Sequence, residues 1–100
     1  MEKKRILMVC EAFGGGVFTY VSQLCNDMVD EFDVYLAYSL RPQTPKNYTD
    51  FLDQRVHLIE MENVGVKGLT NLKSDIAAIK ELRQIEKDVQ PDVIHLHSSV

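Results

Sequence analysis

The sequence has little cysteine, no excess of basic residues and no long hydrophobic run. It therefore lacks the features of disulfide-rich, nucleic-acid-binding and membrane-spanning proteins. Its 100 residues include 11 Lys and Arg against 15 Asp and Glu, which gives a formal net charge of -4. This acidic balance argues against a nucleic-acid-binding protein, whose surface is basic. No apolar run approaches the ~20 residues that a membrane helix needs. The apolar stretch at residues 6–10 is also shorter than a signal-peptide core.

The two cysteines, Cys10 and Cys25, stand at no metal-site spacing. We expect both to be reduced and buried, one in a strand and one in a helix, as in a cytoplasmic protein. The basic cluster at residues 3–5 is interpreted as a solvated strand lead-in, since lipid recognition usually uses four to eight clustered bases.

The hydrophobic pattern predicts four strands. The continuous apolar run at residues 5–10 is typical of a central parallel strand that is covered on both faces. Further strands are expected at 33–38, 56–61 and 93–97. The third of these alternates, so it should be short and near an edge. The polar residues 39–54 predict a long loop with a short helix near 48–52, and a second loop follows at 62–68.

Helical periodicity separates these strands. The first helix is expected from Val17, with the apolar positions Val17, Val21, Leu24, Cys25, Met28 and Phe32. The second should begin between Leu69 and Leu72 and end before Pro91, because the residue before a proline avoids helical angles. Its apolar stripe is Leu72, Ile76, Ile79, Leu82, Ile85 and Val89.

The element order β-α-β-β-α-β predicts an α/β fold. Right-handed crossover connections make 3-2-1-4 the expected strand order, which is half of a Rossmann-like doubly wound parallel sheet. In this order the strand at residues 93–97 lies at an open edge although its sequence is apolar. We expect such an edge to pair with another chain.

Three consecutive glycines follow the first strand. Gly14, Gly15 and Gly16 allow close backbone approach to a ligand, and the helix beyond them favours a negative group. We therefore predict a phosphate near Gly15 and Gly16; a tight turn without ligand is the alternative. The P-loop pattern is absent, and the dinucleotide fingerprint fails at Thr19.

The closing segment, DVIHLHSSV at residues 92–100, delivers polar side chains to the carboxyl end of a strand, where open parallel sheets bind ligands. His97 should lie near the glycine turn and contact a sugar hydroxyl or a phosphate. His95 is interpreted as a satisfied polar residue inside the strand. Ser98 either joins the site or caps a following helix. Two histidines without further ligands do not predict a metal site, and Glu11, in the first loop, is expected to be solvated.

Taken together, KRILMVC at residues 4–10, the glycines and PDVIHLHS at residues 91–98 resemble the N-terminal domain of family 4 retaining glycosyltransferases, which have the two-domain GT-B architecture. The resemblance covers essentially the whole chain. The sequence looks like those of bacterial enzymes that build capsular or other surface polysaccharides. It implies that residues 1–100 are an incomplete acceptor-side domain and that the C-terminal nucleotide-sugar domain is absent.

The resemblance also implies roles for particular residues. Gly15 and Gly16 match the turn that approaches the phosphates of a UDP- or GDP-sugar donor and the acceptor. His97 matches a histidine that contacts the donor sugar near its reactive carbon. No metal or other cofactor is implied. The acceptor would be a glycan or a lipid-linked glycan, with peripheral contact at the inner face of the membrane in the parent enzyme. The chain alone is expected to be inactive.

Two other classes stay open. An NADP- or other nucleotide-binding half of a Rossmann oxidoreductase would use Arg41 for a 2′-phosphate, but the expected acid after the second strand is missing. A non-catalytic interaction module, such as a receiver domain, would need an acidic cluster at the strand ends, and Glu11 alone does not provide one.

Overall fold

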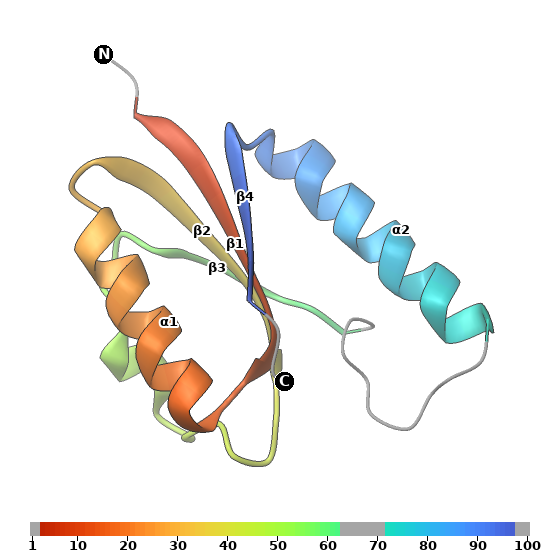
Figure 1. Ribbon diagram of the computed structural model, residues 1–100, viewed down its shortest axis with the longest axis horizontal. Coiled ribbons are helices and arrows are strands. Elements are labelled where there is room, and N and C mark those ends of the chain that lie inside the picture. Colours follow the sequence, from red (N-terminus) through yellow and green to blue (C-terminus); the bar gives the residue numbers. More distant parts are fainter. Residues whose placement is uncertain (1–2, 63–71, 98–100) are drawn as a thin grey trace.

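A four-stranded parallel sheet with one helix on each face forms the protein (Figure 1). The computed structural model describes residues 3–62 and 72–97. Its elements are β1 (Lys4–Phe13), α1 (Gly15–Met28), β2 (Phe32–Leu40), the short 3-10 helix η1 (Tyr48–Phe51), β3 (His57–Glu60), α2 (Leu72–Val89) and β4 (Val93–His97). The strand order is β3-β2-β1-β4, so the predicted α/β fold and strand order are confirmed.

β1 is the central strand, and both of its edges are paired. Its residue Met8 lies opposite Leu36 of β2 and opposite His95 of β4. Both faces of β1 are covered too, because Leu7 and Met8 point to opposite faces and expose only 2% and 0% of their surface. A strand in this position needs apolar residues on both faces, which explains the continuous run seen in the sequence.

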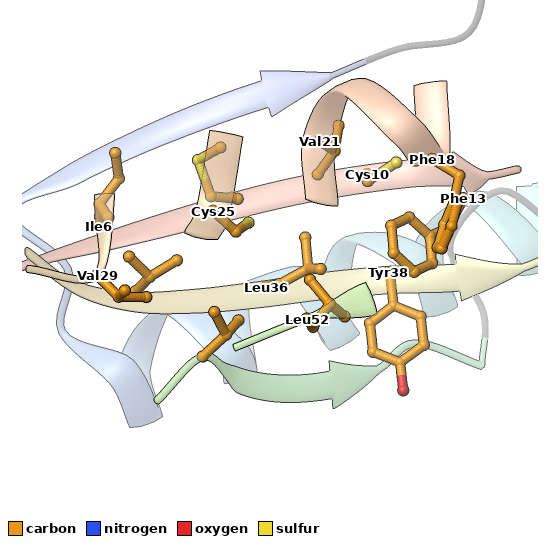
Figure 2. Close-up of a cluster of buried hydrophobic side chains, with 13 residues drawn as sticks. Ile6, Cys10, Phe13, Phe18, Val21, Cys25, Val29, Leu36, Tyr38 and Leu52 are labelled. Carbon is orange, nitrogen blue, oxygen red and sulfur yellow. The ribbon is translucent and has the colours of Figure 1, made fainter. Parts of the chain in front are cut away.

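The larger half of the core lies between the sheet and α1 (Figure 2). The side chains of Phe13, Val21, Cys25 and Leu36 are completely buried there. Phe13 packs edge-on against Phe18, with ring centroids 4.7 Å apart. Both cysteines are buried and reduced, as predicted. Burial raises the pKa of the Cys25 thiol to about 12, so this thiol stays protonated at neutral pH.

The smaller half of the core lies between the sheet and α2, and it corrects the predicted stripe of this helix. Ile85 and Val89 are buried, but Ile76 and Ile79 remain 43% and 50% exposed. Ala78 and Leu82 pack against this cluster as well, so α2 contacts the sheet through Ala78, Leu82, Ile85 and Val89. The sheet side of this cluster is formed by Leu7 and Val9 of β1, Ala37 of β2 and Met61 after β3.

The first strand is longer than predicted. β1 continues past Cys10 to Phe13, and one extra residue in β1 shifts the register between the pairs Cys10–Tyr38 and Phe13–Leu40. The glycines consequently do not form a loop, since only Gly14 separates β1 from α1. The expected place of Phe32 in the first helix is also wrong, because Phe32 begins β2.

β4 is an edge strand with an apolar surface. Among the residues that the structure describes it pairs with β1 alone, and the side chains of Val93, Ile94 and Leu96 are 45%, 44% and 70% exposed. α1 packs mainly on β1 and β2. Exposed apolar strand edges favour pairing with a second chain.

We expect the 100-residue chain to self-associate through β4. Light scattering at rising concentration should give a mean mass above that of the monomer, and Leu96→Lys should lower it because a charge on the edge opposes pairing. Leu58→Lys on β3, where Leu58 is 37% exposed, is the matched control and should leave association unchanged. If the unsubstituted chain stays strictly monomeric at high concentration, this expectation is contradicted.

Candidate functional site

Of the three glycines at the start of α1, two have a structural reason and the third has none. A Cβ on Gly14 would lie 3.0 Å from the Cβ of Gln43 and 3.3 Å from the backbone nitrogen of Thr44, so close packing explains this glycine. Gly15 has φ +57°, a conformation that side chains disfavour. Gly16 has neither constraint, because a Cβ there would meet nothing within 4 Å.

The loop after β2 holds Gly14 in place. The hydroxyl of Thr44 donates a hydrogen bond to the carbonyl of Phe13, and it accepts one from the backbone N–H of Arg41 at 2.9 Å. The Thr44 N–H also donates to the Arg41 carbonyl. These contacts fix the end of β1, and they set where α1 begins.

α1 begins with backbone groups that suit an anion. The first helical hydrogen bond runs from the Phe18 N–H to the Gly14 carbonyl at 3.2 Å, so the N–H groups of residues 15–17 have no partner within the helix. None of the residues in the first turn is acidic, which leaves the positive end of the helix dipole without a neutralising side chain there.

His97 and the start of α1 line one shallow groove. Gly16, Val17 and Tyr20 form the helix side, and Leu96 and His97 form the strand side. The ring centroids of Tyr20 and His97 are 6.0 Å apart in an edge-on arrangement. The prediction that His97 lies near the glycines is thus matched by the geometry, since β4 ends and α1 begins at the carboxyl edge of the sheet.

The imidazole of His97 is half-buried and incompletely partnered. Its Nε2 atom is buried and makes no hydrogen bond to the described part of the chain. Burial lowers the pKa of His97, and the neighbouring His95 lowers it further. A neutral imidazole has one donor and one acceptor nitrogen, so it can bond a hydroxyl in either direction. An unsatisfied buried nitrogen costs about 1–3 kcal/mol, which a ligand hydroxyl would offset.

The other predicted residues have mixed outcomes. His95 shares a face with His97, with ring centroids 4.3 Å apart, but it is exposed rather than satisfied inside the strand. Glu11 lies in β1 and is half-buried, so its expected loop position is wrong. Arg41 lies in the loop after β2. Ser98 falls outside the described residues.

Tyr20 is a site residue that the sequence did not single out. Its side chain is 61% exposed and lines the groove beside His97. The spacing of four residues from Gly16 places Tyr20 one turn further along the same helix face, which is the pattern that would have indicated it.

Metal ligands are not gathered in the part of the chain that the structure describes. Within residues 3–62 and 72–97, no three His, Cys, Asp or Glu side chains come together as a metal would require. His57 lies on β3, at the opposite edge of the sheet from the β4 histidines. Its Nε2 atom is 2.9 Å from a carboxylate oxygen of Asp33 on β2.

Comparison with protein-family models gives no match, and neither does comparison with curated proteins or with solved structures. None of the described helices has the length and apolar character needed to cross a membrane.

The three glycines should respond differently to alanine. Gly16→Ala should stabilise the fold by about 0.5 kcal/mol, because alanine reduces the entropy of the unfolded chain without a clash. Gly15→Ala should destabilise it by about 1 kcal/mol, since its φ is positive. Gly14→Ala should also destabilise it through the contact with Gln43. Urea unfolding followed by circular dichroism measures all three, and equal stability of the Gly15 and Gly16 variants would contradict the left-handed conformation at Gly15.

His97 should make the fold acid-sensitive. Its pKa in the folded chain lies below the ordinary value of about 6.5, so the unfolded chain binds the proton more readily. The free energy of unfolding should therefore fall as the pH drops from about 6.5 toward the folded pKa, and His97→Asn should flatten that dependence. If the free energy of unfolding depends on pH in the same way for the unsubstituted chain and for the variant, the His97 side chain is not buried in the folded chain.

Proposed function

We propose that this chain is the acceptor-side part of a retaining glycosyltransferase that takes its sugar from a UDP- or GDP-sugar. The observation that carries the proposal is the groove in which His97 faces the start of α1. Such a groove offers unpartnered helix amides to a phosphate and an imidazole to a sugar hydroxyl within one site.

The residues divide the work by chemistry. The N–H groups of residues 15–17 would stabilise negative charge on the diphosphate, and the open space at Gly16 lets the ligand reach them. His97, held neutral by burial, would position a donor hydroxyl near the reacting carbon. The acceptor would be a glycan or a lipid-linked glycan of a bacterial surface polysaccharide.

We also propose that the isolated 100-residue chain is inactive. The groove is shallow and lies beside the edge strand β4, and in the proposed enzyme its outer wall would belong to the nucleotide-sugar domain. It also includes a cytoplasmic location, at the inner membrane face when the acceptor is lipid-linked. The reduced, buried cysteines agree with that compartment.

Nuclear magnetic resonance titration tests the donor site. UDP-glucose and GDP-mannose should shift the amide signals of residues 15–17 and the ring signals of His97, and NADP should do so less. His97→Ala should weaken nucleotide-sugar binding about fivefold, the value of one hydrogen bond. His57→Ala is the matched control, because His57 lies on β3 and pairs with Asp33.

Two outcomes would contradict the proposal. Tighter binding of NADP than of either nucleotide sugar would favour the oxidoreductase alternative. Transfer of sugar by the 100-residue chain alone would contradict the incomplete site.

A further inference from the structure

A second groove follows a different face of α1 and shares no residue with the groove at His97. It lies between the helix and the segment that joins β2 to β3. Phe18, Thr19, Ser22 and Gln23 line its helix side, and Gln43 and Phe51 line the opposite side. Of the three glycines, Gly15 also lines this groove, and the histidine strand does not reach it.

One wall of the groove presents an open aromatic ring. Phe51 in η1 is 52% exposed although it is a large apolar side chain. It stands edge-on to the buried ring of Phe18, with centroids 5.5 Å apart and planes at 85°. This contact holds the Phe51 ring in position while leaving part of its surface uncovered.

The wall that carries Phe51 is also held to the helix by its backbone. The Asn26 side chain donates to the Phe51 carbonyl at 2.9 Å and accepts from the Asp53 N–H at 2.7 Å. Both ends of this amide are used, so Asn26 acts as a brace rather than as a ligand group. The groove therefore exists before any ligand binds, which favours affinity.

The helix side and the loop side add polar groups without charge. Thr19, Gln23 and Gln43 are partly or fully exposed along the groove. Ser22 is only 4% exposed, and its hydroxyl makes no hydrogen bond within the described chain. A buried hydroxyl without a partner is uncommon in folded proteins, and a ligand hydroxyl would supply the missing bond.

The residues that line the groove carry no ionisable side chain. A phosphate or carboxylate would lose hydration there without an opposite charge on any side chain, and the single helix-end N–H of Gly15 lies at one end of the groove lining. The best match is a neutral ligand with one apolar face and several hydroxyls, because an aromatic ring takes the face while amides and hydroxyls take the polar groups.

We propose that this groove binds a neutral hexopyranose ring, with its apolar face on Phe51 and its hydroxyls on Gln23, Gln43 and Ser22. The inference does not rest on the proposed function, because the side chains that carry it are absent from the groove at His97; of the residues assigned to the diphosphate, Gly15 also lines this groove.

Titration of the 100-residue chain with methyl glucoside, methyl galactoside and methyl mannoside tests the inference by nuclear magnetic resonance. At least one glycoside should shift signals around Ser22, Gln23 and Phe51 while leaving His97 unchanged. Phe51→Ala should weaken that binding about tenfold, as expected for the loss of an aromatic contact. Ile79→Ala is the matched control, because Ile79 is similarly exposed and lies on α2.

Several results would overturn the inference. It fails if none of the three glycosides shifts these signals, or if Phe51→Ala and Ile79→Ala bind equally well. It also fails if cyclohexanol binds as tightly as the glycoside, since the groove would then recognise only apolar surface. Binding of UDP-glucose at His97 is scored separately in the same spectra, so failure of the donor site and failure of this groove are distinguishable.

Discussion

The structure depends on the burial of β1 between two strands and two helices. Leu7 faces α2 and Met8 faces α1, and neither side chain keeps contact with water. A parallel strand cannot be connected to its neighbour by a tight turn, so the chain must cross over one face before it returns. Since all four strands are parallel, their carboxyl ends lie at one edge of the sheet. His97 and the start of α1 meet there for this reason.

The position of α1 is set by aromatic packing at the end of β1. Phe13 is fully buried against Phe18, Tyr38 and Tyr48, and the loss of such a ring typically costs about 3–5 kcal/mol. Keeping Phe13 in β1 moves the start of the helix to Gly15. The helix then has one groove toward β4 and another toward the β2–β3 segment. The first combines an imidazole with free helix amides, whereas the second is uncharged, so the two suit ligands of different chemistry.

Local sequence pattern predicts the elements of this fold, whereas contacts between distant segments decide their packing. The run at residues 5–10, the helical stripe from Val17 and the break at Pro91 were enough to predict the elements and their order. The pairing of His97 with the glycine turn followed from that order. The extension of β1 to Phe13 was missed because its partners come from α1, β2 and η1, which no local window contains. Ile76 and Ile79 were assigned to the core because periodicity marks an apolar face but not what covers it.

The sequence by itself determined the α/β class, the strand order and the two chemical features at the carboxyl edge, glycine and histidine. Each of these depends on local pattern or on the handedness of crossovers, which all L-residue chains share. Only the tertiary structure decided that Gly14 is packed against Gln43, that Gly16 faces open space and that Ser22 and Phe51 line a second groove. Those facts depend on which side chains approach across elements, and packing distances between distant segments are not contained in the spacing of residues along one segment.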